Sequence, residues 1–178
     1  RDCLQRPQIP LQIRPVSRSL WDTFGKYHYL AHTIHKASKC FAAFYNNRPV
    51  AFTAVLHLMH PKGTMWKEHR TVCLPDFQGV GIGNTMSNYI ASAFHGYLNR
   101  QYTSVTANPA MVAYRARSPL WKMTRKPKIN MGAKSVIRKR GSAGAKKFRE
   151  SFCDNRITAS FKYVGPSNTQ ATRLLGLI

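Results

Sequence analysis

Acidic residues are scarce in this sequence: six aspartates and glutamates stand against 28 lysines and arginines, giving a formal net charge of +22 over 178 residues. No acid occurs between Asp76 and Glu150. A chain so poor in acid attracts polyanions, most often nucleic acid. The alternative is a surface charge that only keeps the protein soluble. We favour polyanion binding, and we expect it to involve the basic region at 114–149.

Long apolar runs are also missing, because none approaches the roughly 20 residues that span a bilayer, so we expect no membrane association. The N-terminus has neither an apolar signal segment nor an initiator methionine. The four cysteines, at positions 3, 40, 73 and 153, form no Cys-x-x-Cys pair, which argues against a zinc knuckle or a redox pair. We therefore expect reduced thiols, a cytoplasmic location, and a chain that is trimmed or is a module of a longer protein.

The remaining composition is that of a folded domain, since 43% of the residues are apolar. We expect residues 1–10 to be a linker or truncated N-terminal extension, and 11–178 to be a single domain with a basic loop or insertion at about 122–150. Alternation predicts strands at 11–16, 40–45, 50–57, 66–74, 102–107 and 157–164, with a hairpin turn at 46–49. Helices are predicted at about 17–27, 82–98 and 109–117, and the apolar tail 174–178 is predicted to dock on the core or on a partner.

A glycine-rich loop, Gln78-Gly79-Val80-Gly81-Ile82-Gly83, lies between a predicted strand and a predicted helix. Its backbone N–H groups are not shielded by side chains and converge at a helix N-terminus, where a pyrophosphate is favoured. The loop does not match the G-x-G-x-x-G dinucleotide fingerprint, and no acid follows about 20 residues later to bind a ribose. Without a Gly-Lys-Ser/Thr it is not a P-loop either.

The segment Val72-Cys73-Leu74-Pro75-Asp76-Phe77-Gln78-Gly79-Val80-Gly81-Ile82-Gly83 resembles motif A of the GNAT (Gcn5-related N-acetyltransferase) superfamily, Gln/Arg-x-x-Gly-x-Gly/Ala after a strand. The predicted element order along most of the chain resembles that family too. The resemblance implies an α/β fold with a central, mostly antiparallel sheet flanked by helices. It also implies an N-acyltransferase that uses acetyl-CoA or another acyl-CoA.

The same resemblance implies which residues bind the acyl-CoA. The strand before the loop would splay from its neighbour and pair with the pantetheine arm, and the loop amides would hold the pyrophosphate. Tyr114 would protonate the leaving CoA thiolate, although the Asn-to-Tyr spacing is about one residue short and the segment from Arg115 to Trp121 departs from the family pattern. The implied acyl-CoA residues are Val72, Cys73, Leu74, Gln78, Gly79, Val80, Gly81, Ile82, Gly83, Asn84 and Asn108.

Glu68 is the only carboxylate between Asp22 and Asp76, and it lies within a predicted strand ten residues before Gln78. A carboxylate there can accept a proton from an attacking amine, so Glu68 is the candidate general base. Alternation places Glu68 and Arg70 on one face of the strand and His69 on the other. The alternative is a surface glutamate paired with Arg70 or Lys67.

The triplets Tyr27-His28-Tyr29 and Glu68-His69-Arg70 resemble elements of the phage Mom-type DNA-modification proteins, which are GNAT-like. That resemblance implies an acceptor pocket lined by His28, Tyr29 and Arg70 together with Glu68. A similar domain occurs behind ABC-type ATPases, so a fused or associated ATPase module is a possible partner.

Three functions follow. The first is an N-acyltransferase acting on a nucleic-acid base or a nucleic-acid-associated amine. The others are a non-catalytic nucleic-acid-binding module on the same fold, and a basic small-molecule or protein N-acetyltransferase. His28, His32 and His35 have helical spacing, but without acidic or cysteine neighbours we expect ordinary polar histidines and no metal.

Overall fold

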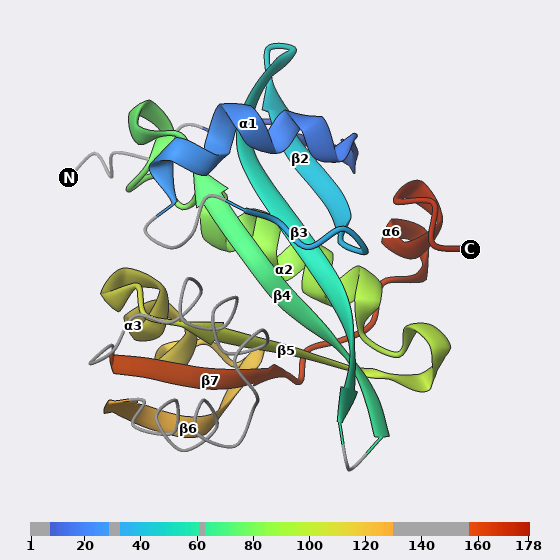
Figure 1. The fold of residues 1–178 in the computed structure, drawn as a ribbon, viewed down its shortest axis with the longest axis vertical. Coiled ribbons are helices and arrows are strands. Elements are labelled where there is room, and N and C mark those ends of the chain that lie inside the picture. The colour runs from blue at the N-terminus through green and yellow to red at the C-terminus, as the bar shows by residue number, and fades with distance from the viewer. Residues whose placement is uncertain (1–7, 29–32, 61–62, 130–156) are drawn as a thin grey trace, which may run out of the picture.

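A seven-stranded sheet forms the centre of the protein (Figure 1). The computed structural model describes residues 8–28, 33–60, 63–129 and 157–178. The strand order is β1-β2-β3-β4-β5-β7-β6. All neighbouring strands are antiparallel except β4 and β5, which are parallel. The strands are β1 (Gln12–Pro15), β2 (Lys39–Tyr45), β3 (Arg48–His60), β4 (Gly63–Cys73), β5 (Gln101–Thr106), β6 (Trp121–Ile129) and β7 (Ile157–Tyr163).

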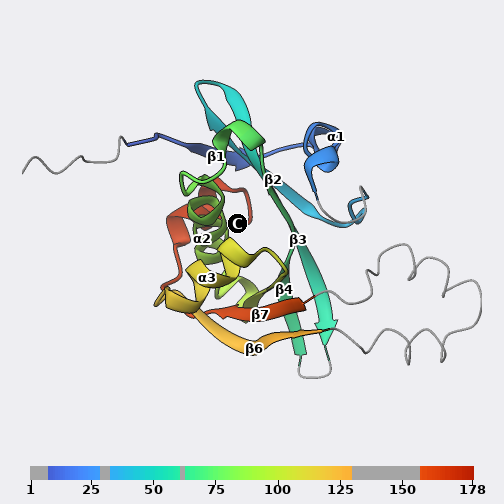
Figure 2. The same ribbon diagram turned by 90° about the vertical axis from the view of Figure 1, so that its left-hand side faces the viewer.

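Helices cover both faces of the sheet. Helix α1 (Trp21–Phe24), extended by short 3-10 turns at Arg18–Leu20 and Gly25–Tyr27, lies on one face. Helices α2 (Ile82–Phe94), α3 (Pro109–Arg117) and α6 (Thr169–Leu174) lie on the other, as Figure 2 shows. Further 3-10 turns occur at Pro75–Phe77 and Tyr97–Asn99. This is the expected α/β fold with a mostly antiparallel sheet, and in the described part of the chain no helix is long and apolar enough to cross a membrane.

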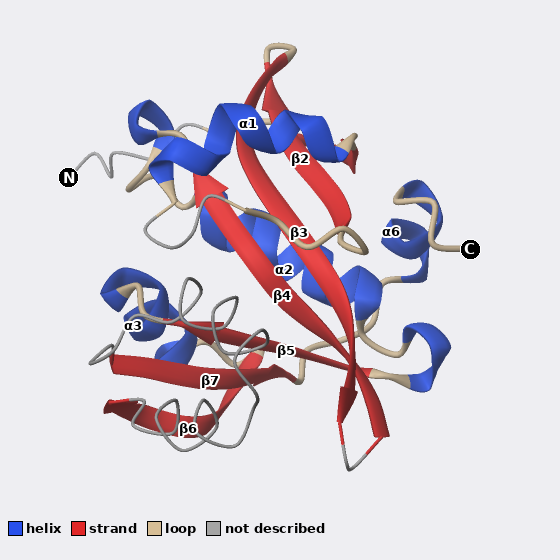
Figure 3. Cartoon of the chain, in the orientation of Figure 1, coloured by secondary structure: helices blue, strands red, loops and turns tan. Residues whose placement is uncertain are grey.

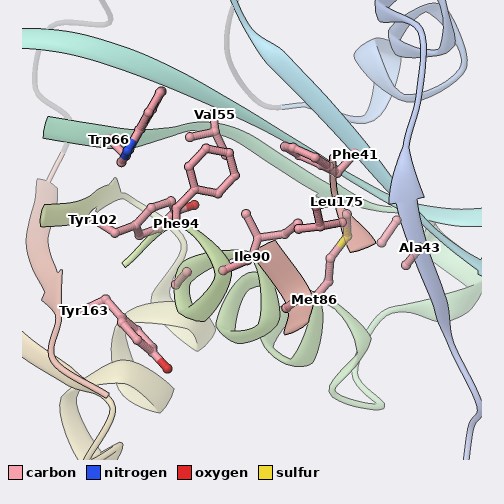
Figure 4. Packing of buried hydrophobic residues seen from close by; sticks show 14 of the residues in the cluster. Phe41, Ala43, Val55, Trp66, Met86, Ile90, Phe94, Tyr102, Tyr163 and Leu175 are labelled. Atoms are coloured by element: carbon pink, nitrogen blue, oxygen red, sulfur yellow. The ribbon is translucent and has the colours of Figure 1, made fainter. Parts of the chain in front are cut away.

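The main core lies between the sheet and α2. The apolar face of α2 is built at helical spacing by Ile82, Met86, Ile90 and Phe94, all buried. Phe94 packs edge-on against Trp66 of β4, with ring centroids 5.1 Å apart (Figure 4). Leu175 and Leu177 are buried in the same cluster, so the apolar tail docks on the core.

A smaller cluster occupies the opposite face. Trp21 and Phe24 of the α1 region pack there against Phe52 and Ala54 of β3 and Val72 of β4. The two clusters cover both sides of β3 and β4, which fixes these strands beneath the functional site.

Several boundaries differ from the sequence predictions, and two of the differences have a clear physical cause. The turn between β2 and β3 is only Asn46–Asn47, because both residues adopt positive φ (48° and 61°) as a two-residue hairpin turn requires, and Arg48 and Pro49 belong to β3. The predicted basic loop or insertion begins with a strand instead: β6 pairs with β7 over 121–129 (Figure 3). Edge strands tolerate lysines and a proline, so a strand of this composition looks like a loop in the sequence. Residues 130–150 lie outside the described residues.

Candidate active site

A cleft opens where the parallel strands β4 and β5 separate. Their pairing runs from Met65–Gln101 to Glu68–Ser104 and stops there. Beyond this point the strands enclose a cleft of about 690 Å³. Its lining comes from both faces of the sheet: Asn84, Met111 and Tyr114 from the α2 and α3 side, and Tyr27 and His28 from the α1 side. Two molecules can therefore approach the same point from opposite faces.

The glycine loop forms one wall of the cleft. Gly79 and Gly81 adopt positive φ, 81° and 96°, a conformation that other residues rarely adopt. A side chain at either position would meet nothing within 4 Å, so open space lies in front of the loop. Gly81 is the N-cap of α2 and provides no side-chain cap, which leaves the first N–H groups of the helix available. The geometry fits a pyrophosphate bound by backbone amides.

Side-chain hydrogen bonds hold the ends of this loop together. Gln78 Nε2 donates to the carbonyl oxygen of Cys73 at 2.8 Å, and Cys73 Sγ donates to the carbonyl oxygen of Phe77 at 3.2 Å. Burial raises the pKa of the Cys73 thiol to about 11, so it stays protonated and remains a donor. Gln78 therefore shapes the loop in this structure.

A β-bulge in β4 decides which side chains face the cleft from each side. Val55 of β3 pairs with Glu68, and the next residue, Ala54, pairs with Arg70, so His69 is the extra residue. Val55 belongs to the main core beside α2 (the α2 cluster), and Ala54 belongs to the smaller cluster beside α1 (the α1 cluster). Glu68 therefore faces α2, and Arg70 faces α1. The prediction that Glu68 and Arg70 share a face was wrong, because strict alternation does not hold across a bulge.

Glu68 lies at the apex of the cleft in a buried hydrogen-bond network. Its Oε1 accepts hydrogen bonds from Thr71 Oγ1 at 2.8 Å and Ser87 Oγ at 2.7 Å. Its Oε2 accepts one from Arg115 Nη2 at 2.7 Å. Arg115 also donates to Ser87 and Ser104, so one ion pair joins β4, β5, α2 and α3.

The network favours the ionised form of the Glu68 carboxyl group. Burial alone would raise the pKa of Glu68, but the Arg115 guanidinium and hydrogen bonds from Ser104, Ser87 and Arg115 lower it below its ordinary value of 4.5. Glu68 is therefore ionised at neutral pH and holds its proton weakly. Its partner is Arg115 of α3, whereas the sequence alternatives were Arg70 and Lys67.

Tyr114 lines the cleft and takes part in a second network. Trp121 Nε1 donates to Asn88 Oδ1 at 2.8 Å, and an indole N–H can only donate. The Asn88 amide must therefore present its Nδ2 to Tyr114, and the Tyr114 hydroxyl accepts that bond at 2.8 Å. Because its oxygen accepts from Asn88, the phenolic proton is free to be donated into the cleft.

The half of the cleft on the α1 side is rich in cations and histidines. Lys67, His69, Arg70 and His28 all line it. Burial, together with the charges of Arg70, Lys67, His35 and His28, lowers the pKa of His69 to about 3, so its ring is neutral at physiological pH. Its Nε2 accepts a bond from the His35 backbone N–H at 3.4 Å, which leaves the ring proton on Nδ1.

Most of the predicted site residues lie together in this cleft. Two do not line it: Leu74 packs against the α1 cluster, and the Val80 side chain is exposed. Asn108 lines the cleft, and its side chain also caps α3 by accepting from Met111 N at 3.1 Å. Tyr29 and His32 lie outside the described residues. Within the described ranges, no cluster of potential metal ligands occurs.

Three residues that take part in the cleft or its hydrogen-bond networks were not among the predicted site residues: Arg115, Asn88 and Lys67. Arg115 could have been suspected, because it follows Tyr114 directly and a lone buried carboxylate needs a cationic partner. Among 28 basic residues, however, nothing in the sequence distinguishes it.

A splayed pair of parallel strands, a glycine loop capping the following helix and a tyrosine across the cleft define an acyl-CoA-dependent acyltransferase. Residues 9–115 match the model of the acetyltransferase (GNAT) family, and the chain belongs to that family. The prediction of a GNAT-type N-acetyltransferase is thereby confirmed at the level of the family. No curated protein matches the sequence.

Solved structures share the fold at low sequence identity. The "IAA acetyltransferase" from Bacillus cereus is 12% identical, with a TM-score of 0.57 over 86% of this chain and 99% of that one. The ribosomal-protein-S18-alanine N-acetyltransferase from Escherichia coli is 10% identical, with a TM-score of 0.54 over 86% and 93%. A GNAT acetyltransferase from Elizabethkingia anophelis with acetyl-CoA bound is 12% identical, with a TM-score of 0.52 over 86% and 97%. At these identities the likeness shows the fold.

Proposed function

We propose that this protein transfers an acetyl group from acetyl-CoA to an exocyclic amine of a nucleic-acid base. The observation that carries the acceptor assignment is the charge of the cleft. Lys67 and Arg70 line it, and the only carboxylate among the described lining residues is Glu68, which is ion-paired to Arg115. A protonated amine would be repelled there, whereas an acceptor that carries phosphates and an uncharged amine would be attracted.

Acetyl-CoA is the proposed donor, bound from the side of α2 and α3. The amides at the start of α2 would hold its pyrophosphate, and the free edge of β4 at Val72 to Leu74 would pair with its pantetheine arm. The open space in front of Gly79 and Gly81 supports this placement. The acetyltransferase from Elizabethkingia anophelis, which shares the fold and has acetyl-CoA bound, adds support of a general kind.

The chemistry then needs no strong base. The amine nitrogen attacks the thioester carbonyl carbon, the carbon–sulfur bond breaks, and sulfur leaves as a thiolate. Tyr114 donates its phenolic proton to that sulfur and regains a proton from the nitrogen, so one proton passes from nitrogen to sulfur. An exocyclic base amine is uncharged at neutral pH, so no carboxylate has to deprotonate it before attack.

Glu68 takes a modified role in this proposal. As a buried anion of lowered pKa it is a weak proton acceptor, which argues against general-base catalysis. It keeps Arg115 and the two strands in place at the point where donor and acceptor meet. We propose that Glu68 acts as a positioning residue for the reaction.

The resemblance to Mom-type proteins supports an acceptor pocket, but one without Glu68. Arg70 and His28 line the acceptor half, with Tyr29 as a further proposed member, while Glu68 faces the other side of the sheet. A cytoplasmic reaction is proposed, in keeping with the free thiols of Cys40 and Cys73. An associated ATPase module stays a proposed partner.

The test is acceptor-dependent release of the CoA thiol by the purified protein. Duplex DNA, single-stranded DNA, RNA and a lysine-containing peptide would be offered at equal concentration with acetyl-CoA, with Gly81→Glu as the inactive control. We expect release above the hydrolysis background with a polynucleotide, and none with Gly81→Glu. Release with the peptide alone would indicate a protein acetyltransferase, and polynucleotide binding without release would indicate a non-catalytic module; either would refute the proposal.

A further inference from the structure

Lysines occupy aligned positions across the outer half of the sheet. Lys122 of β6 pairs with Lys162 of β7, Lys162 pairs with Thr103 of β5, and Thr103 pairs with Lys67 of β4. Directly paired residues on neighbouring strands point to the same face of a sheet. Lys122, Lys162 and Lys67 therefore form one row, and Lys67, at its inner end, lines the cleft.

Two further rows run beside the first. In one, Arg125 pairs with Ser160, which pairs with Val105; in the next, Lys128 pairs with Thr158. Arg125 Nη2 donates to Thr158 Oγ1 at 2.6 Å. Val105 and Thr158 also line the cleft, so these rows reach the same place. We call the five basic residues of the three rows the cationic face: Lys67, Lys122, Arg125, Lys128 and Lys162.

This face is the one that α2 and α3 do not cover. Along β7, Ala159, Phe161 and Tyr163 are buried toward the helices, while Thr158, Ser160 and Lys162 alternate with them. Lys122, Arg125 and Lys128 are exposed on the neighbouring edge strand. In Figure 1 the β5–β7–β6 half of the sheet lies clear of α1, which covers β2 to β4.

The arrangement costs stability. Like charges placed directly opposite on neighbouring strands repel, as Lys122 and Lys162 must. Burial and the charges of Arg70 and Arg125 lower the pKa of Lys67. Among the described acids, Glu68 faces α2 and is bound to Arg115, Asp22 lies in α1, and Asp76 lies beside the glycine loop, so none neutralises this face. Arrangements that oppose stability in this way are expected at functional sites.

We propose that the cationic face binds the sugar–phosphate backbone of the acceptor and directs a base into the cleft. This inference rests on the proposed function and assigns its nucleic acid a surface. Three strand spacings separate Lys122 from Lys67, about 14 Å, which is the axial length of about four nucleotides of one strand. The face thus has room for several consecutive phosphates.

The side chains between the cations indicate backbone contact. The paired positions carry Thr103, Val105, Thr158 and Ser160, with no aromatic ring among them. Sheet surfaces that read bases stack them on aromatic side chains. Binding to this face is therefore independent of the nucleotide sequence. The aromatic contact comes at the cleft, where the half-exposed Tyr27 is placed to stack on the incoming base.

The test compares two double variants that each remove two charges. Lys122→Gln with Lys162→Gln removes the two outer charges of the first row and leaves Lys67. Arg14→Gln with Arg173→Gln removes exposed charges from β1, at the opposite edge of the sheet, and from α6. Binding to a fluorescent duplex and to its single strand would be measured by anisotropy at several salt concentrations. Acetyl-CoA affinity and thermal unfolding report on the fold.

For the Lys122/Lys162 variant we expect the slope of log affinity against log salt on the duplex to fall in magnitude by about 1.8. On the single strand it should fall by about 1.4. The Arg14/Arg173 variant should keep the wild-type slope. Thermal stability of the Lys122/Lys162 variant should hold or rise, because a repulsive pair is removed, and its acetyl-CoA affinity should be unchanged.

Equal slopes for the two double variants would overturn the inference. The inference would also be overturned if the Lys122/Lys162 variant still transferred the acetyl group with the wild-type salt slope and the wild-type KM for a polynucleotide acceptor. In that case the proposed function would stand. If the wild type binds through this face and yet releases no CoA thiol with any polynucleotide, the surface is supported and the proposed function fails.

Discussion

Arg115 Nη2 lies 2.7 Å from Oε2 of Glu68, and the two side chains are 1% and 5% exposed. The pair sits at the last paired position of β4 and β5, Glu68–Ser104, so it closes the apex of the cleft. Water is excluded from both charges, so loss of either partner would leave the other charge buried without compensation. The cleft geometry therefore depends on an interaction between a strand and a helix 47 residues apart.

Acid should weaken the fold through Glu68. Its folded pKa is lowered, so as the pH falls through the ordinary value of 4.5 the unfolded chain takes up a proton before the folded one does. The stability is complete above that pH and is lost as the pH falls through the folded pKa. Urea unfolding between about pH 3 and 6 should show this fall in wild type and a shallower one in Glu68→Gln. Asp22→Asn, at an exposed carboxylate of α1, is the matched control and should keep the wild-type slope. Equal slopes for wild type and Glu68→Gln would show that the pair does not hold the pKa down.

Removing Arg115 should destabilise the protein more than removing a surface arginine. Arg115→Ala leaves the Glu68 carboxylate buried without its partner, which costs about 3–5 kcal/mol. Arg117→Ala, at an exposed position of the same helix, should cost little. In a double-mutant cycle, Glu68→Gln with Arg115→Met should cost less than the sum of the single changes. Additive costs measured in urea would mean that the two charges are not coupled.

The sequence allowed prediction of the parts of this site that follow from local patterns. The glycine loop between Cys73 and Ile82 has its own signature, and the helix after Asn108 begins with Pro109, so both were placed correctly. The bulge at His69 was not foreseen, because it arises from the pairing of β4 with β3 and leaves no mark on composition. Arg115, the partner of Glu68, was not foreseen either, because it lies 47 residues away in the chain and meets Glu68 only in the folded protein.

The direction of the hydrogen bond between Asn88 and Tyr114 should control turnover. Tyr114→Phe removes the phenolic proton and should lower kcat about 10²–10⁴-fold. Asn88→Asp keeps an acceptor for Trp121 but has no N–H, so the Tyr114 hydroxyl would donate to it and turn its proton away from the cleft. Its kcat should fall while KM for acetyl-CoA stays near wild type.

A purely structural role for Asn88 gives a different result. If Asn88 were only structural, Asn88→Asp would lower stability and leave kcat per folded molecule unchanged. Circular dichroism measures the folded fraction and active-site titration counts the active molecules, so together they separate this result from a true fall in kcat. An Asn88→Asp protein that turns over like wild type contradicts the proposed proton donation by Tyr114.

Two glycines of the loop should respond differently to substitution. Gly81 has a φ of 96° and caps α2, so Gly81→Glu introduces both strain and a carboxylate where a pyrophosphate is proposed to bind. Calorimetry should detect no acetyl-CoA binding. Gly83 has an ordinary helical conformation, and an added methyl group would lie 4.0 Å from Cys73 Cβ, an ordinary contact. Gly83→Ala should fold and bind acetyl-CoA; loss of binding in both variants, or in neither, would contradict the assignment of the amides.

The acceptor half of the site was the hardest to predict. His28 and Arg70 line the cleft, and their role toward an acceptor stays a prediction. Lys67 also lines the cleft, and the lysines of β6 and β7 continue outward from it only because four strands align them. In the sequence, Lys122 and Lys162 are separate basic residues among many. A charge count predicts polyanion binding but gives it no place on the molecule, and the surface proposed for it follows only from the strand register.

The acceptor assignment is tested most directly by mass spectrometry of nucleosides from cells that express the protein. DNA and RNA would be digested to nucleosides and compared between cells making wild type and cells making Gly81→Glu, with protein hydrolysates analysed in parallel. We expect an acetylated nucleoside in the wild-type sample that is missing with Gly81→Glu. Acetylation that depends on Gly81 but appears only on proteins or small amines would contradict it.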